Sequence, residues 1–202
     1  MITEHGKQIK EAVEQVLAKD KWKYQYNEEF QFFHFGLGLN GPFKLIDYVL
    51  AIREDSFTVY AKISIGPDIH DPAMMYNMME FLCRANYNMQ QGNYQMDVND
   101  GELIFKVYVD CEGGMIPNSE IIRNSIRCPA FMFQYHAPGI IGIIYHGQTA
   151  AEAIEACELE RTKLAERLED NQEDDSEEVS KDEESDIPSF DEYVREREAG
   201  GT

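Results

Sequence analysis

Three neighbouring segments alternate between apolar and polar residues, and this alternation constrains the fold more than any other feature of the chain. The segments are FQFFHFGLGL, KLIDYVLAI and FTVYAKISI, with short breaks at 40–42 and 54–56. A period of two predicts strands that bury one face, and short breaks favour their joining into an antiparallel sheet. The residues expected on the buried face are Phe33, Phe35, Leu37, Leu39, Ile46, Tyr48, Leu50, Ile52, Phe57, Val59, Ala61, Ile63 and Ile65.

Helical spacing flanks this sheet on both sides. Residues 4–19 place apolar side chains at the spacing of an amphipathic helix, and Asp71 with Pro72 predicts the start of a second helix that continues to Ala85. The second helix is rich in methionine. Its apolar stripe is typical of a core face, but adaptable methionines also line partner grooves. We therefore name Met75 and Met79 as candidate partner-binding residues.

The segment GNYQMDVNDGELIFKVYVDC raises the question of a metal site, because Asp97–Gly101 looks like the start of a calcium loop. An EF-hand loop needs Gly at position 6 and Glu at position 12. Counting from Asp97 places Gly101 at position 5 and Tyr108 at position 12, so no EF-hand is predicted. Asp100 and Gly101 instead suit a two-residue type I′ hairpin turn, which pairs Val98 with Leu103, Met96 with Phe105 and Tyr94 with Val107.

The same region carries a family resemblance. FLCRANYNMQQGNYQMDVNDGELIFKVYVDC, SEIIRNSIRCPAFMFQYHAPGIIGIIYHG and AAEAIEACE resemble the YbjN-like family of bacterial proteins, most specifically at 86–87, 92–94 and 100–102. The resemblance covers most of residues 1–157. It implies an α+β fold like that of type III secretion chaperones, with about five strands in the order helix, three strands, helix, two strands, helices. The family is described as sensory-transduction or stress regulators without established catalytic residues, so it supplies no site residues.

The following segments are predicted to be helical. Ser119 can cap a helix through Arg127, which Pro129 then kinks or interrupts. Periodicity alone leaves residues 139–146 open between helix and strand, and the family resemblance favours helix. Thr149 and Glu152 form a capping box that opens a further helix through about Glu169. Its thin apolar stripe comprises Ile154, Cys157, Leu164 and Leu168.

These elements predict three regions: an α+β domain at 1–157, a helical extension at 158–169 and an acidic tail at 170–202. Residues 170–186 of this tail almost lack the apolar residues that would offset the entropy of ordering, so the tail is predicted to be disordered apart from a possible short motif near its end. Within it, residues 187–199 show a capping box from Ser189 to Glu192 and a stop at Gly200. This short helical motif offers candidate anchors that bind either another protein or the methionine-rich flank of the chain's own domain: Ile187, Phe190, Tyr193 and Val194.

Charge and composition narrow the function. The formal net charge is −20; residues 158–202 contribute 6 minus 18, or −12, and the rest contribute −8. Both parts should repel nucleic acid and anionic membranes. No export signal or membrane-length apolar run is present, and the four cysteines form no C-x-x-C pair, so a cytoplasmic location is expected. No motif for a cofactor, a metal or a nucleophile–base pair stands in a suitable context.

Two classes of function follow. The first is a non-enzymatic interaction module that binds an unidentified protein client or regulator, or forms a homodimer. The second is an enzyme or small-ligand protein whose pocket is lined by Phe32, His34 and Tyr48 on the aromatic sheet. The absence of catalytic and cofactor motifs favours the first class, the interaction module, and no cofactor is expected.

Overall fold

The computed structural model describes residues 2–39, 41–87 and 89–174, with side chains up to residue 163. The described residues form an α+β fold with six strands and four α-helices. In chain order the elements are α1 (Glu4–Lys19), β1 (Tyr24–Asn27), β2 (Phe32–Gly38), β3 (Leu45–Ile52), β4 (Ser56–Lys62), α2 (Pro72–Asn86), β5 (Asn93–Met96), β6 (Leu103–Asp110), the 3₁₀ turn η1 (Glu112–Gly114), α3 (Ser119–His146) and α4 (Ala150–Asp174).

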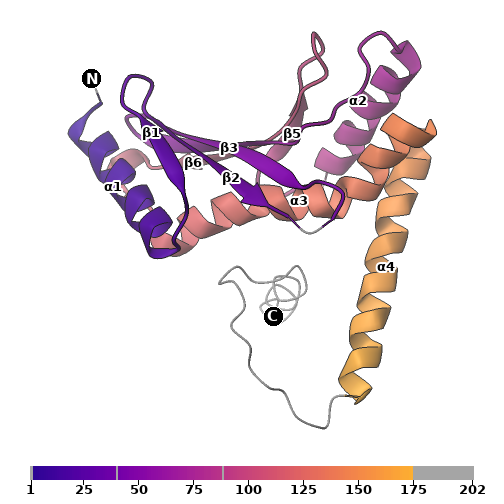
Figure 1. Cartoon of the computed structure of the whole chain (residues 1–202). Coiled ribbons are helices and arrows are strands. Elements are labelled where there is room, and N and C mark those ends of the chain that lie inside the picture. The colour runs from indigo at the N-terminus through magenta and orange to yellow at the C-terminus, as the bar shows by residue number, and fades with distance from the viewer. Residues whose placement is uncertain (1, 40, 88, 175–202) are drawn as a thin grey trace. The chain divides into compact units, whose positions relative to one another are not determined.

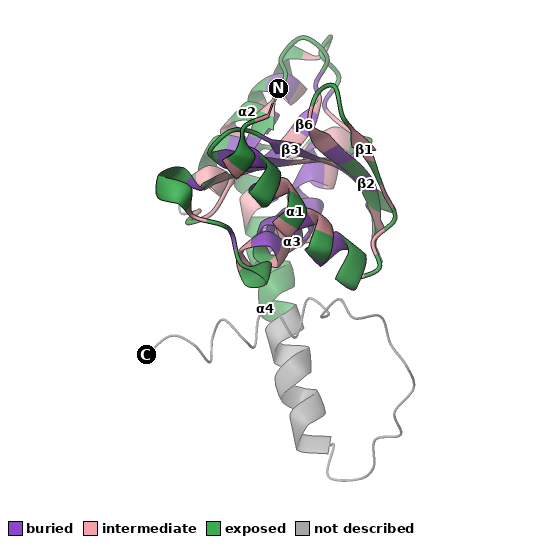
Figure 2. Ribbon diagram, turned by 90° about the vertical axis from the view of Figure 1, so that its left-hand side faces the viewer, coloured by how far each residue is buried: buried purple, intermediate pink, exposed green. Residues whose placement is uncertain are grey.

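The six strands form one antiparallel sheet in the order β1-β2-β3-β4-β6-β5. Helices α1 and α3 lie on the same side of it (Figures 1 and 2). Facing them, Phe35 stands opposite Tyr48 and Leu50 opposite Val59, all of them buried. The predicted buried face is therefore confirmed over most of β2, β3 and β4. Three of its predicted members, Leu37, Leu39 and Ile65, are only half-buried, and Thr58, which was predicted on the opposite face of β4, is buried as well.

The expectation of about five strands missed β1. This strand has only four residues, which is too short for a convincing periodic pattern. Its Tyr24 and Tyr26 pack on Phe33, with ring centroids 5.4 and 4.6 Å away. Aromatic contacts across neighbouring strands therefore hold β1 at the edge of the sheet.

Helix α1 is confirmed at its predicted ends. Thr3 Oγ1 accepts a hydrogen bond from the Gly6 N–H at 3.1 Å and caps the first turn. At the other end, Asp20 accepts two hydrogen bonds from Arg123 of α3, at 2.7 and 2.8 Å. This bidentate pair holds the pKa of the Asp20 carboxyl below its ordinary value. It joins two elements that pack on the same face of the sheet.

The β5–β6 hairpin is present, but the predicted register is wrong. Tyr94 lies opposite Phe105 rather than Val107, and Met96 lies opposite Leu103 rather than Phe105. The Asp97 N–H donates to the Glu102 carbonyl at 3.0 Å, and the Gly101 N–H donates to the Asp97 carbonyl at 2.8 Å. Only Gly101 in this loop has a positive φ, +77°, so the type I′ turn, which needs two such residues, is also wrong.

Helix α3 runs unbroken from Ser119 to His146 with Pro129 and Pro138 inside it. Of the two outcomes predicted at Pro129, a kink or an interruption, the interruption is wrong because the helix continues through this residue, and helix at 139–146 is confirmed. The cap is Asn118 rather than Ser119: its Oδ1 accepts from the Ile121 N–H at 2.9 Å. An internal proline costs about 3 kcal/mol, and burial of a large apolar side chain contributes about 1.5–3 kcal/mol. The buried residues that offset the prolines include Ile122, Ile126, Phe133, Ile140 and Ile143.

Helix α4 begins with the predicted capping box. The Thr149 N–H donates to Glu152 Oε2 at 2.8 Å, and the Glu152 N–H donates to Thr149 Oγ1 at 3.3 Å. The helix continues to Asp174, so 170–174, predicted to be disordered, are helical. The chain divides into two compact units, Met1–Cys157 and Glu158–Thr202. The rest of the predicted tail, from 175 onwards, lies outside the described residues.

Candidate interaction surface on helix α2

Helix α2 begins at the cap that the sequence predicts. Asp71 Oδ1 accepts hydrogen bonds from the N–H groups of Ala73 and Met74, at 3.0 and 3.1 Å, and Pro72 occupies the first helical position. One side of the helix faces the domain and buries Met75, Met78, Phe81 and Leu82. The opposite side is left toward solvent.

That solvent side carries a continuous stripe of apolar and aromatic residues, which we call the α2 stripe: Tyr76, Met79, Cys83 and Tyr87. Their spacing of three, four and four residues places them on one face of the helix. Tyr76 is 63% exposed, Met79 45% and Tyr87 86%, and Cys83 is exposed as well. Single exposed apolar residues are ordinary, but four in register on one helix make this face a candidate interaction surface.

The charges on α2 cancel. Glu80 and Arg84 are the only charged residues between Pro72 and Asn86, and Arg84 donates to Glu80 Oε1 from Nε at 2.9 Å and from Nη2 at 2.6 Å. The whole chain carries a net charge of −20. The stripe is therefore a locally neutral surface on a strongly acidic protein, and covering it removes little charge from water.

The buried side of α2, opposite the stripe, packs closely against α3. The Phe81 ring lies edge-on to His136, with centroids 5.8 Å apart. A Cβ at Gly139 would lie 2.5 Å from the Phe81 ring and 2.8 Å from the Ala153 carbonyl oxygen. Only glycine at this position allows α3 to approach so closely. The packing of Phe81 against α3 therefore fixes the position of the helix that carries the stripe.

A buried polar network lies in the same region. The Tyr94 hydroxyl donates to the Met132 carbonyl at 2.6 Å and lies 3.1 Å from His136 Nδ1. Asn86, at the end of α2, pairs with the backbone of Tyr94: its amide donates to the Tyr94 carbonyl at 3.0 Å, and its Oδ1 accepts from the Tyr94 N–H at 2.7 Å. These contacts join the end of α2 to β5 and α3. They give a structural role to Asn86 and Tyr94.

Burial sets the protonation of this network. His136 is 4% exposed, and this burial lowers its pKa to about 4, although the bond to the Met132 carbonyl opposes the shift. Neutral His136 with its proton on Nδ1 can donate to Tyr94 Oη while Tyr94 donates to Met132. Burial also raises the pKa of Tyr94 well above its ordinary range. Both groups therefore stay neutral near pH 7, as a packed polar network requires.

The structure separates the two methionines predicted to bind a partner. Met79 lies in the α2 stripe at 45% exposed, whereas Met75, one turn earlier, is 9% exposed and packs toward the domain. The other predicted anchors, Ile187, Phe190, Tyr193 and Val194, lie outside the described residues. Tyr76 and Tyr87 were missed by the sequence analysis. Their spacing from Met79 and Cys83 was the signal that could have found them.

The alternative pocket on the sheet does not come together. Phe32 and His34 point to the outer face of β2, where His34 Nε2 lies 2.7 Å from Asp47 Oδ1. Tyr48 points to the opposite, inner face, is fully buried, and donates its hydroxyl to the Ile126 carbonyl at 2.9 Å. Because the sheet separates them, these three residues cannot line one cavity.

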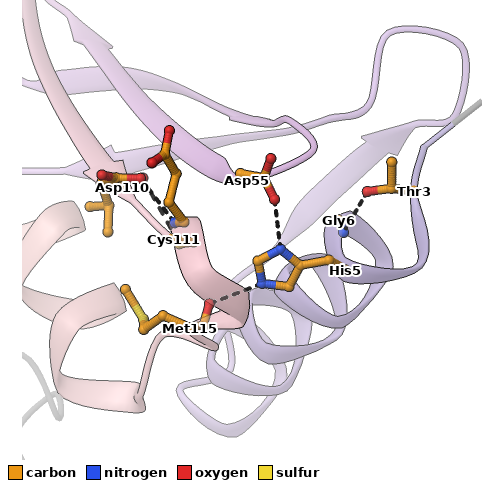
Figure 3. Close-up of polar contacts among 9 residues, drawn as sticks. Thr3, His5, Gly6, Asp55, Asp110, Cys111 and Met115 are labelled. Carbon is orange, nitrogen blue, oxygen red and sulfur yellow. Dashed lines mark hydrogen bonds and ion pairs between the residues drawn. The ribbon is translucent and has the colours of Figure 1, made fainter.

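A second polar cluster ties the start of α1 to the sheet (Figure 3). His5 Nδ1 lies 3.0 Å from Asp55 Oδ1, and His5 Nε2 lies 3.1 Å from the Met115 carbonyl oxygen. The Asp55 carboxylate, and then the Met115 carbonyl, raise the pKa of His5 because both accept hydrogen bonds from the protonated ring. Nearby, burial raises the pKa of the Cys111 thiol, which disfavours a reactive thiolate. The cluster joins α1 to the β3–β4 turn and to the segment after β6.

The Asp97 side chain organises its own turn: Oδ1 accepts from the backbone N–H of Asn99 at 2.8 Å. No group of three or more His, Cys, Asp or Glu side chains in the described part of the chain is placed to hold a metal ion. None of the described helices combines the length and apolar character needed to cross a membrane. Comparison of the chain with protein-family models, curated proteins and solved structures gave no significant match.

Proposed function

We propose that this chain is a non-enzymatic, cytoplasmic protein-interaction module, acting as a regulator or chaperone-like adaptor of the YbjN-like family. The observation that carries the proposal is the α2 stripe: two tyrosines, a methionine and a cysteine exposed in register on a neutral, firmly supported helix. Aromatic residues and methionine are enriched where proteins bind one another, and charges are depleted there. The order of helices and strands, apart from β1, supports the family assignment.

The binding mode follows from the geometry of the surface. A helix face with anchors at positions i, i+3, i+7 and i+11 offers side chains to a groove or to another helix. The anchors are preformed on a packed helix, so binding costs little ordering entropy. The predicted C-terminal motif, with Phe190 and Tyr193, offers a second and separate contact in this proposal.

Affinity capture from native lysate tests the proposal, with the full chain as bait. Tyr76→Glu and Met79→Glu place a charge in the stripe and should reduce the captured partners at least tenfold. The matched control is Tyr108→Glu on β6, because Tyr108 is 58% exposed and Tyr76 63%. A Phe190→Ala, Tyr193→Ala bait tests the C-terminal anchors separately. Identical captured proteins with all baits would refute a role for the stripe and for the motif.

A further inference from the structure

Both nitrogens of the His5 ring face groups that can only accept a hydrogen bond (Figure 3). Nδ1 lies 3.0 Å from the Asp55 carboxylate, and Nε2 lies 3.1 Å from the Met115 carbonyl oxygen. A neutral imidazole carries one N–H and can satisfy only one of these acceptors, whereas the protonated ring donates to both. The side chain is only 18% exposed, so little water reaches the ring to replace a lost partner. The geometry therefore matches the protonated ring.

The Asp55 side of this contact is held firmly. A Cβ at Gly6 would lie 3.0 Å from the Arg53 carbonyl oxygen, so the first turn of α1 packs closely on the β3–β4 turn. The Cys111 N–H donates to the Asp55 carbonyl at 2.9 Å and joins the same turn to the end of β6. The distance from His5 to Asp55 is therefore fixed by the packing of the surrounding backbone.

The Met115 side is held less firmly. Met115 lies in the connection between β6 and α3, residues 112–117. Gly113 and Gly114 in this connection have φ of +70° and +80°, and a Cβ added to either would meet no atom within 4 Å. In the described part of the chain, the contact with His5 is the only hydrogen bond that joins residues 113–117 to another element. Its loss would free the backbone of the connection, while the Met115 side chain stays packed on the core.

We propose that His5 is a pH-operated latch: the protonated ring holds the connection against α1, and the neutral ring releases it. The neutral ring keeps its proton on Nδ1, because a carboxylate is a stronger acceptor than a carbonyl. The bare Nε2 then faces the Met115 carbonyl oxygen, and the two lone pairs repel one another. The latch lies outside α2 and is independent of the proposed function.

The direction of the response follows from the two acceptors. The Asp55 carboxylate, and then the Met115 carbonyl, raise the pKa of His5 above its ordinary value. The latch is therefore fully closed below about pH 6.5, the ordinary value for histidine, and opens as the pH rises through the folded pKa. Raising the pH in this range should loosen the connection between the sheet and α3.

The other ionisable groups on the elements around His5 leave this response to the histidine. Burial raises the pKa of the Cys111 thiol, which therefore stays protonated while His5 titrates. Lys7 pairs with Glu4 at 3.1 Å, and the Glu112 N–H donates to the Asp110 carboxylate at 2.9 Å. In the described structure none of the remaining charged groups bonds to the ring: Glu4 and Lys7 on α1, Arg53 and Glu54 before the turn, and Asp110 and Glu112 after β6.

NMR relaxation of the isotope-labelled full chain, from about pH 5.5 to 8.5, tests the latch across the range in which histidine titrates. The backbone order parameters of Gly113, Gly114 and Met115 should be about 0.85 with the latch closed and fall toward about 0.6 with it open. The midpoint of that fall should coincide with the pKa of the His5 ring, read from its own shifts in the same samples. Asp55→Asn removes the carboxylate and should lower both midpoints by the same amount.

Two further variants separate the latch from a general effect of pH. His5→Gln offers a single donor nitrogen, which cannot reach both acceptors, so the connection should be mobile at every pH. The matched control is His34→Gln, because His34 also contacts a carboxylate, that of Asp47 at 2.7 Å, but through one ring nitrogen. This control should keep the full response. Circular dichroism checks the fold of each variant. Order parameters that stay constant while His5 titrates, or a midpoint that does not follow His5 in Asp55→Asn, would overturn the latch.

Discussion

Acid should destabilise the domain through His136, and the geometry sets the size of the effect. His136 is neutral and buried, with a pKa of about 4 in the folded chain, against about 6.5 when unfolded. Because the unfolded chain takes up the proton first, the stability is complete above pH 6.5. It falls progressively as the pH drops from 6.5 toward 4. At about 1.36 kcal/mol per unit, the loss between pH 7.5 and 4.5 is about 2.5 kcal/mol.

Urea unfolding at a series of pH values measures this loss. The single tryptophan, Trp22, packs edge-on to Phe35 with ring centroids 5.1 Å apart, so its fluorescence reports on the core. The variant His136→Asn keeps an amide near the position of Nδ1 but cannot titrate. It should be less stable at pH 7.5, because removal of the ring leaves a cavity. Its deficit relative to the wild type should shrink by about 2.5 kcal/mol at pH 4.5.

The control is His146→Asn, since His146 is exposed at the end of the same helix. This variant should keep the loss of about 2.5 kcal/mol that His136 causes between pH 7.5 and 4.5. Carboxylates also titrate below pH 5, but they are common to all three proteins and cancel in the differences. If His136→Asn keeps the full pH dependence of the wild type to within about 0.5 kcal/mol, His136 is not buried as described and the reasoning fails.

Three further predictions follow from contacts outside this network. NMR titration should give His5 a pKa above 6.5. Because this pKa is raised in the folded chain, the destabilisation caused by His5→Gln should be largest below pH 6.5. It should fade as the pH rises past the folded pKa. Gly139→Ala should lower the urea-unfolding free energy by about 1–3 kcal/mol despite the better helix propensity of alanine, whereas Gly38→Ala, with open space around it, should not show this clash. Gly101→Val should lower the thermal midpoint by several degrees, because φ is +77° and the new Cβ would lie 2.5 Å from the Pro67 carbonyl; an unchanged midpoint would contradict this geometry.

The hairpin shows which part of the fold a sequence pattern can determine. The faces of β5 and β6 were predicted correctly, because alternation assigns each side chain to a side of the sheet. The register was not, since a shift of two residues leaves every side chain on its own face and satisfies the same pattern. In the structure the two hydrogen bonds from the Asn86 side chain, at the end of α2, to the backbone of Tyr94 help to hold the register. No local pattern reveals such a contact.

Helix α3 shows that tertiary packing can override a local sequence signal. Pro129 predicts a kink or an interruption on local grounds, yet the helix continues through it and through Pro138. The compensating term is tertiary: the helix buries residues from Ile122 to Ile143 along its length. Short segments such as β1 fail for a related reason, because four residues carry almost no periodic signal and their stability comes from Phe33 on the neighbouring strand.

Of the α2 stripe, the sequence analysis named Met79 as a candidate partner-binding residue. The low charge of the helix indicates this face better than its methionine content does. Met75 and Met79 are the same residue type one helical turn apart, so composition cannot separate them. In the structure Met75 packs against the domain, whereas Met79 is exposed. Charge behaves differently, because an exposed helix face on an acidic protein ordinarily carries acidic residues. Between Pro72 and Asn86 one acidic residue is balanced by one basic residue, while the face around them stays apolar. A solvent-exposed face that forgoes charge gains nothing in solubility, and this is why the α2 stripe is a candidate interaction surface.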